Sequence, residues 1–225
     1  MQNRRGLFAG MQSGRLSGFV PYKGTKDLPN AGRISRFIRN FVDMKVALCQ
    51  FSMEWEAAAR NLRRAEELVA QAGADLALLP EMFATGFVTE PWRTALPDEE
   101  ELLAWMRRTA RRYATALAGS AVVRSGDRFA NRFFFVRPAG GAERYDKRHL
   151  FSIGGEDAHF VAGRRRVVVE YGGLRFLPLV CYDLRFPVWC RCRSDYDAIL
   201  CVASWPAPRR EVWRTLLRAR AIENQ

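Results

Sequence analysis

Short apolar runs alternate with amphipathic stretches of helical period from Met44 onward, and this alternation constrains the fold more than any other feature of the chain. Residues 45–51 and 75–80 are apolar runs of strand length, whereas residues 54–72 and 98–117 carry apolar side chains at helical spacing. Gly73 stands where the first of these helices is expected to end. The alternation favours an α/β protein with helices packed on its sheets.

The second half of the chain predicts more strands than helices. Strands are expected over residues 119–124, 132–137, 143–146, 166–171, 175–180 and 196–203, with turns at the Gly-containing pairs 126–127, 140–141 and 172–173. A last helix is expected over residues 209–223. One set of alternating elements accounts for residues 44–225, so we expect a single α/β layered domain there.

Residues 1–43 differ from the rest in composition and show no sustained periodicity. They hold eight basic and two acidic residues and therefore contribute half of the chain's net charge of +12. We interpret them as a basic leader that is disordered or that arises from a start codon assigned too early. Their charge leaves open a function of another class, a non-catalytic interaction or nucleic-acid-binding protein that uses the leader. No recognition motif supports this alternative, so we expect no nucleic-acid partner.

Two further features, the absence of a long apolar run and the number of cysteines, bear on where the protein acts. No apolar run approaches the roughly 20 residues that a membrane helix needs, so we expect no membrane association. The chain has an odd number of cysteines, five, and no apolar signal segment, which is typical of a reducing, cytoplasmic compartment. Cys190 and Cys192 lack the two-residue spacer of common metal pairs, and His149 and His159 are the only histidines. We therefore expect no metal site.

Three residues with useful chemistry directly follow expected strands. Glu81 follows DLALLP, Lys147 ends YDK, and Cys181 follows LPLV. The ends of buried strands are where α/β enzymes place functional side chains, because the rigid backbone fixes them while the loops admit substrate. A cysteine attacks as its thiolate, a carboxylate can take the thiol proton, and an ammonium group offsets the charge on an attacked carbonyl oxygen.

Each residue also has a plainer interpretation. Cysteine is among the most buried residue types, so Cys181 taken alone is more often part of a core. Glu81 could be a charge at a helix N-terminus, and Lys147 could be one of 36 solvated cations. Only the combination, with its flanking sequence, points to catalysis.

The flanking sequence resembles the nitrilase superfamily of carbon–nitrogen hydrolases. The segments LLPEMFATGF, YDKRHLFSIGGE and VCYDLRFP carry the resemblance in their order, and MKVALCQ and WPAPR…RARAIENQ extend it over residues 44–225. It implies a four-layer αββα sandwich, a homodimer and no cofactor. The chain stops inside an expected helix at Gln225. We therefore expect the sandwich to lack its C-terminal elements here, with further residues encoded beyond this point.

The resemblance also implies a role for each matching position. Cys181 matches the nucleophile that forms a thioester, and Glu81 matches the general base. Lys147 matches the cation at the oxyanion, with the backbone N–H of Tyr182 as its companion. Glu156 occupies the place of a second glutamate that orients the amine and relays protons, although it could also be a surface loop acid.

Within the superfamily, the chain looks most like omega-amidases, which hydrolyse the terminal amide of small 2-oxo acids such as 2-oxoglutaramate or 2-oxosuccinamate. Another amidase or a carbamoyl hydrolase of the same superfamily is the alternative. Arg185 could hold the carboxylate of such a small-molecule amide, or could equally pair with Asp183. Phe83, Phe87 and Trp205 could wall the pocket, although aromatic residues are more often plain core.

Overall fold

The computed structural model describes residues 12–14, 44–93 and 98–225, and the rest of the expected leader lies outside the described residues. Strand β1 (Gln12–Gly14) belongs to the leader segment and pairs antiparallel with β2 (Val46–Leu48). One short strand of the expected leader, Gln12–Gly14, therefore extends the first sheet.

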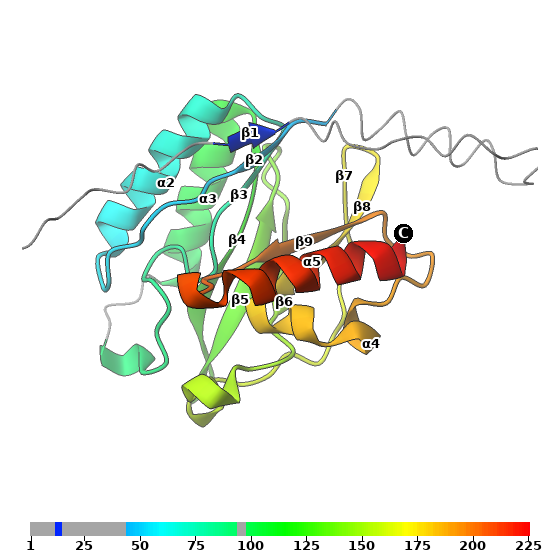
Figure 1. The fold of residues 1–225 in the computed structure, drawn as a ribbon. Helices are drawn as coiled ribbons and strands as arrows, with labels where there is room; N and C mark the ends of the chain where they lie inside the picture. Colours follow the sequence, from blue (N-terminus) through cyan, green and yellow to red (C-terminus); the bar gives the residue numbers. More distant parts are fainter. Residues whose placement is uncertain (1–11, 15–43, 94–97) are drawn as a thin grey trace, which may run out of the picture.

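The first sheet has six strands in the order β1-β2-β3-β4-β5-β6 (Figure 1). Its other members are β3 (Leu76–Leu78), β4 (Ala116–Ser125), β5 (Arg128–Val136) and β6 (Ala142–Asp146). Strands β2, β3 and β4 run parallel, whereas β4, β5 and β6 form antiparallel hairpins. Parallel neighbours need crossover connections, and α2 (Ala58–Ala72) and α3 (Glu99–Tyr113) provide them.

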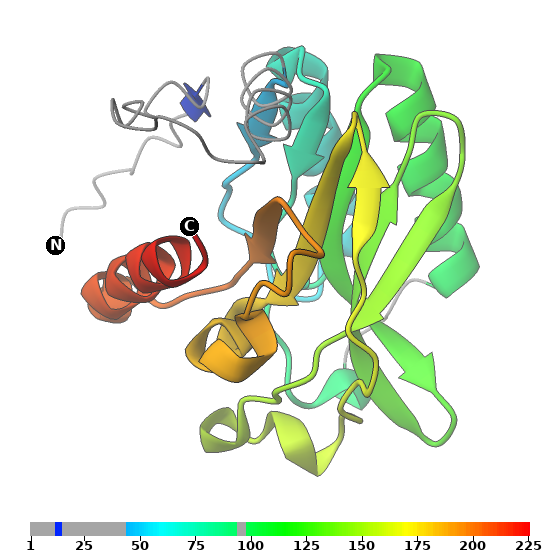
Figure 2. The same ribbon diagram turned by 90° about the vertical axis from the view of Figure 1, so that its right-hand side faces the viewer.

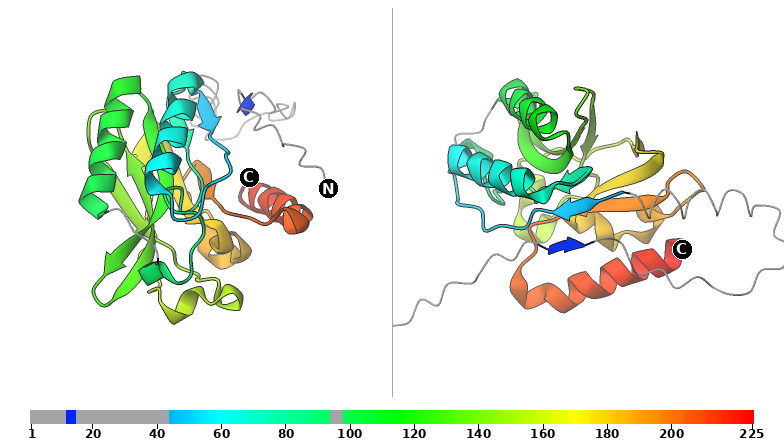
Figure 3. Two further views of the ribbon diagram at one scale, coloured as in Figure 1. Left: turned by 90° about the vertical axis from the view of Figure 1, so that its left-hand side faces the viewer. Right: turned by 90° about the horizontal axis from the view of Figure 1, so that it is seen from above.

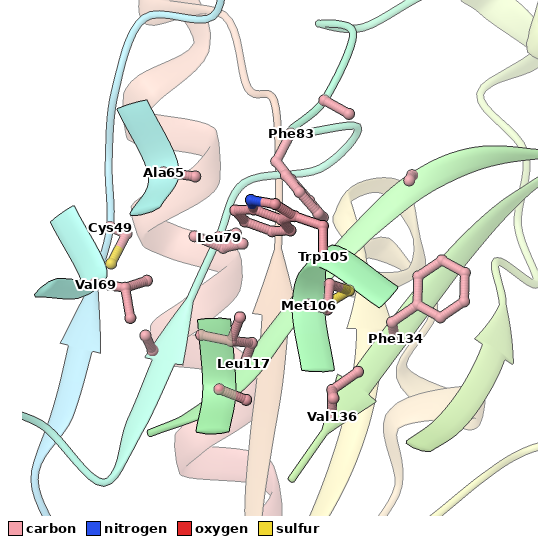
Figure 4. Packing of buried hydrophobic residues seen from close by; sticks show 14 of the residues in the cluster. Cys49, Ala65, Val69, Leu79, Phe83, Trp105, Met106, Leu117, Phe134 and Val136 are labelled. Carbon is pink, nitrogen blue, oxygen red and sulfur yellow. The ribbon is translucent and has the colours of Figure 1, made fainter. Parts of the chain in front are cut away.

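Helices α2 and α3 bury their apolar faces against the first sheet (Figure 4). The core between them includes Val69 of α2, Met106 of α3 and Leu117 of β4. Gly73 ends α2 in the left-handed conformation (φ 49°), as its sequence position predicts. Asp98 caps α3 by accepting a hydrogen bond from the Glu100 backbone N–H at 2.8 Å.

Helix α3 ends four residues earlier than the pattern predicted. Ala114 takes the left-handed conformation (φ 50°), and the Thr115 hydroxyl donates to the carbonyl of Ala74 at 2.7 Å. Ala116 and Leu117 then pair with β3 as the first residues of β4. Their apolar side chains fit a helix and a buried strand equally well, and the available partner strand decides between them.

The second sheet has three strands, β7 (Val169–Tyr171), β8 (Leu174–Val180) and β9 (Ala198–Val202). It packs face to face on the first sheet through one shared core, in which the rings of Phe135 and Phe176 stack with centroids 6.4 Å apart. Helices α4 (Pro187–Cys190) and α5 (Arg210–Asn224) lie on the opposite side, where Trp213 and Leu216 contact the other face of β8 and β9 (Figure 2).

The protein is therefore an α/β fold with two packed sheets and helices on both outer faces. Seen from above in Figure 3, the helices α2 and α3 lie at one side and α5 at the other, with both sheets between them. Within the described parts of the chain, no helix is long and apolar enough to cross a membrane. Glu81, Lys147 and Cys181 follow the strands β3, β6 and β8, and they meet in one region between the sheets.

Candidate active site

Glu81 is held by a turn that follows β3 and is anchored to β4. The backbone N–H of Met82 donates to the Ser120 hydroxyl at 3.1 Å, and that of Phe83 donates to the Ser120 carbonyl, also at 3.1 Å. Met82 has a positive φ of 51°. The turn directs the Glu81 side chain inward, where it is fully buried, and its Oε2 accepts the backbone N–H of Ser204 at 2.9 Å.

Lys147 lies directly after β6 and forms two buried ion pairs. Its Nζ is 2.9 Å from Oε1 of Glu81 and 2.8 Å from Oε2 of Glu156, and all three side chains are 0% exposed. Glu156 opens a short 3-10 turn (Glu156–Ala158), and its Oε2 also accepts the backbone N–H of Phe151 at 2.7 Å. Glu156 is thus a fully buried partner of Lys147, and the surface-loop interpretation of this residue is wrong.

Cys181 begins a 3-10 turn (Cys181–Arg185) at the end of β8 and has a φ of 48°, a conformation that non-glycine residues rarely adopt. The buried carboxylate of Asp183 holds this turn. It accepts the backbone N–H of Val180 at 3.1 Å, the Tyr145 hydroxyl at 2.8 Å and His149 Nδ1 at 2.8 Å. Asp183 therefore ties the cysteine turn to the segment that carries Lys147.

The electrostatics of the cluster keep the thiol protonated and the amine charged. Burial raises the pKa of the Cys181 thiol, the nearby Glu81 carboxylate raises it further, and Lys147 only partly opposes them. Burial lowers the pKa of Lys147, but the negative charges of Glu81 and Glu156 outweigh it, so this pKa is raised overall. A neutral thiol beside a carboxylate can attack only as its proton moves to that carboxylate.

The aromatic residues expected at the pocket divide into two groups. Phe87 faces the cluster, because its ring centroid lies 5.9 Å from Lys147 Nζ. Trp205 lies 5.5 Å from the guanidinium carbon of Arg185. Phe83 is instead fully buried in the core between α3 and the first sheet, with its ring 5.9 Å from that of Trp105. The plain-core alternative is therefore correct for Phe83.

Arg185 does not pair with Asp183, which takes its hydrogen bonds from Tyr145, His149 and the backbone. Its guanidinium carbon lies 5.7 Å from the ring centroid of Tyr182 and 5.5 Å from that of Trp205. The exposed arginine thus packs on rings next to the cysteine. The structural-pairing alternative is wrong for this residue.

Sequence reasoning missed two groups that contact the cluster. Asn131 of β5 is fully buried, and its Nδ2 donates to Glu81 at 2.9 Å and to Glu156 at 3.0 Å. A lone amide within the apolar strand RFANRFFFV was a usable signal, because buried polar side chains need partners. The Ser204 backbone N–H left no such signal, since every residue except proline carries that group.

Comparisons with known proteins identify the family of this chain. The family model described as carbon–nitrogen hydrolase matches residues 45–225. The omega-amidase YafV of Yersinia enterocolitica is 48% identical over 183 residues, which cover 81% of this chain and 71% of that protein. The 2-oxoglutaramate amidase of Bacillus subtilis is 32% identical over 187 residues, which cover 80% of this chain and 72% of that protein.

A solved structure gives the same result for the fold. It is that of a carbon–nitrogen hydrolase superfamily protein from Xanthomonas campestris with an arsenic adduct in its active site. The two structures align with a TM-score of 0.75 at 40% sequence identity, over 80% of this chain and 72% of that one. Because the family model and the relatives cover most of the chain, this protein belongs to the carbon–nitrogen hydrolase family of the nitrilase superfamily.

Proposed function

We propose that this protein is a cofactor-free omega-amidase. It would hydrolyse the terminal amide of a small carboxylated amide, 2-oxoglutaramate or 2-oxosuccinamate, to the 2-oxo dicarboxylate and ammonia. The observation that carries the proposal is the buried contact of Lys147 with Glu81 and Glu156 beside the Cys181 thiol. Two relatives, an omega-amidase and a 2-oxoglutaramate amidase, support the substrate class.

In the first step, the Cys181 sulfur forms a bond to the amide carbon while its proton moves to Glu81. The carbonyl oxygen gains the negative charge. An ammonium group has three N–H donors, and Lys147 uses two of them on Glu81 and Glu156. Its third donor, together with the backbone N–H of Tyr182, would stabilise the oxyanion.

In the second step, the carbon–nitrogen bond breaks and Glu81 returns its proton to the departing nitrogen, so that ammonia leaves and a thioester remains. A water molecule then gives a proton to Glu81 and attacks the thioester. The proton finally returns to the sulfur as the carboxylic acid product leaves. Glu156 would orient the amine and relay protons, a role supported by its bond to Lys147 at 2.8 Å.

The substrate carboxylate requires a cation, and Arg185 is our proposal for it. Arg185 packs on Tyr182 and Trp205, and Tyr182 directly follows the nucleophile in the chain. Phe87, which lies 5.9 Å from Lys147 Nζ, and Trp205 would wall the pocket. A guanidinium group held against rings is well placed for bidentate recognition of a carboxylate.

A substrate panel tests the proposed function. Ammonia release from 2-oxoglutaramate and 2-oxosuccinamate is expected to exceed release from an N-carbamoyl amino acid and from a simple nitrile, as measured by kcat/KM. Preference for the N-carbamoyl amino acid would instead identify a carbamoyl hydrolase, and preference for an amide without a carboxylate would identify another amidase of the superfamily.

Replacement of Arg185 tests the carboxylate site. Arg185→Gln is expected to raise KM for 2-oxoglutaramate by about 10- to 100-fold, because a hydrogen bond to a charged group contributes about 1.5–3 kcal/mol. Butyramide, which has no carboxylate, should be hydrolysed as well as by the unchanged enzyme. Arg218→Gln, at an exposed position on α5, is the matched control. Equal losses for both amides would contradict the assignment.

We further propose that the helix–sheet–sheet–helix arrangement is the four-layer αββα sandwich of the superfamily, and that the protein forms a homodimer. Large apolar side chains exposed on α4 and α5 support the dimer, namely Val188 (74% exposed) and Ile222 (78% exposed). Light scattering on the purified protein measures the oligomeric state, and a monomer at micromolar concentration would contradict the proposal.

A further inference from the structure

We infer that Asn131 is a positioning residue of this site, whose side-chain amide joins the Glu81 and Glu156 carboxylates and leaves a single oxygen of Glu81 to exchange the thiol proton. This inference deepens the proposed function and rests on it.

Asn131 contacts three members of the cluster from the middle of β5. Its Nδ2 donates to Oε1 of Glu81 at 2.9 Å and to Oε1 of Glu156 at 3.0 Å. A side-chain amide has two N–H donors, so both are used on the two carboxylates. The backbone carbonyl of Asn131 also accepts the N–H of Lys147 at 2.9 Å. One residue therefore fixes both acids and the backbone of the cation between them.

The hydrogen bonds are divided unequally between the two oxygens of Glu81. Oε1 accepts from Lys147 and from Asn131, which fills both of its lone-pair directions. Oε2 accepts only the Ser204 backbone N–H at 2.9 Å, which leaves one of its lone-pair directions free. Asn131 thus helps to restrict the proton exchange with Cys181 to Oε2.

The orientation of the amide group is set by charge. If the amide were reversed, Oδ1 would face two carboxylate oxygens, which repel it. With Nδ2 facing the acids, Oδ1 is buried and has no hydrogen-bond partner among the described residues. A buried acceptor without a partner destabilises the folded state. The hydrogen bonds that Nδ2 donates to two ionised carboxylates offset this cost, so the two donors explain the amide at this position.

Removal of these donors should change how the site responds to pH. The charged and titratable groups around Glu81 are Lys147 after β6, Glu156 on its 3-10 turn, Cys181 on the cysteine turn and Cys201 on β9. A donated hydrogen bond stabilises an ionised carboxylate, so its loss favours protonation. A protonated Glu81 cannot take the thiol proton, and the acid limb of activity should therefore move to higher pH.

The experiment compares Asn131→Leu and Asn131→Asp with the unchanged enzyme, using two readouts over pH 4–9. The first is kcat and KM for 2-oxoglutaramate, and the second is the rate at which iodoacetamide alkylates Cys181, followed by peptide mass spectrometry. We expect Asn131→Leu to lower kcat by about 10- to 100-fold with little change in KM, because the loss is that of a hydrogen bond to a charged group.

The acid limb of both profiles should move up by about one pH unit in Asn131→Leu, which corresponds to about 1.4 kcal/mol. Asn131→Asp keeps the side-chain volume and adds a third carboxylate, so its shift should be at least as large. Thr115→Val is the matched control, since Thr115 is another buried polar residue (0% exposed), and its hydroxyl donates to the backbone carbonyls of Ala74 and Tyr113 just before β4. It should lose stability without a shift in either profile.

Two outcomes separate this inference from the proposed function. Unshifted profiles in both Asn131 variants would overturn the positioning role, whatever the amide specificity of the enzyme. A shifted alkylation profile in a protein that hydrolyses no carboxylated amide would support the positioning role while contradicting the omega-amidase proposal. If Asn131→Leu does not fold, the Asn131→Asp profile alone decides.

Discussion

Cys181→Ala is expected to abolish amide hydrolysis, with a fall in kcat of at least about 10⁴-fold, because loss of a nucleophile in a covalent mechanism removes the main route. Alanine keeps the backbone turn, so the fold should survive. Ammonia release from 2-oxoglutaramate measures the loss, and circular dichroism checks the fold. The covalent step should also disappear, so no acyl adduct should form on the protein when substrate is rapidly quenched.

Cys192→Ser is the matched control for this variant. The Cys192 thiol is partly exposed and lies 3.4 Å from the carbonyl of Tyr196, a contact that a serine hydroxyl can keep. Its activity should equal that of the unchanged enzyme. Substantial turnover by Cys181→Ala would show that the reaction does not pass through this thiol.

Lys147→Met is expected to have the largest effect on stability. It removes the cation from two fully buried carboxylates that lie 2.9 and 2.8 Å from its Nζ. Breaking a buried ion pair by removal of one partner typically costs about 3–5 kcal/mol, because the other charge stays buried without compensation. Domains usually have only about 5–15 kcal/mol of stability in total. Urea unfolding followed by circular dichroism measures the loss, and activity should vanish with it.

Two comparisons make this expectation specific. Lys45→Met, the same substitution at an exposed lysine, should change the free energy of unfolding by no more than about 0.5 kcal/mol. Adding Glu156→Gln to Lys147→Met should recover part of the loss, because one of the two uncompensated charges is then gone. A Lys147→Met protein as stable as the unchanged one would mean that its two ion pairs contribute nothing to the folded state.

The difference in stability between Lys147→Met and the unchanged protein should also depend on pH. In Lys147→Met, two carboxylates face each other without a cation, so protonation of one of them relieves the repulsion. The stability gap between this variant and the unchanged protein should therefore narrow as the pH falls. A gap that widens toward acid pH would contradict the assigned charges of Glu81 and Glu156.

Much of the fold could be predicted from short stretches of sequence. Gly73 ends α2 and Asp98 caps α3 because each acts on backbone groups within a few residues of itself. The apolar runs before Glu81 and Cys181 marked the strands that carry these side chains. The end of α3 was not predictable in this way, because the choice between helix and strand at Ala116 depends on β3, a partner 40 residues earlier in the register Leu76↔Ala116.

Some residues of the candidate site could likewise be predicted from local sequence, and others could not. The identity and order of Glu81, Lys147 and Cys181 were readable, since each stands at the end of an expected strand inside a specific motif. Asn131, a lone amide in an apolar strand, indicated a buried polar partner, but that partner, Glu81, lies 50 positions away and no local pattern identified it. The separation of Phe83 in the core from Phe87 near Lys147 was equally invisible.

Local sequence thus determined where strands and helices occur and which reactive side chains follow them, because capping and periodicity act within one or two turns of the chain. Only the tertiary structure decided that Asp183 bonds Tyr145 and His149 rather than Arg185, and that Glu156 is buried against Lys147. The physical reason is that burial and charge pairing depend on side chains that meet only after the sheets have packed. Lys147 and Glu81 are 66 positions apart, yet their contact at 2.9 Å sets the charge state of the site.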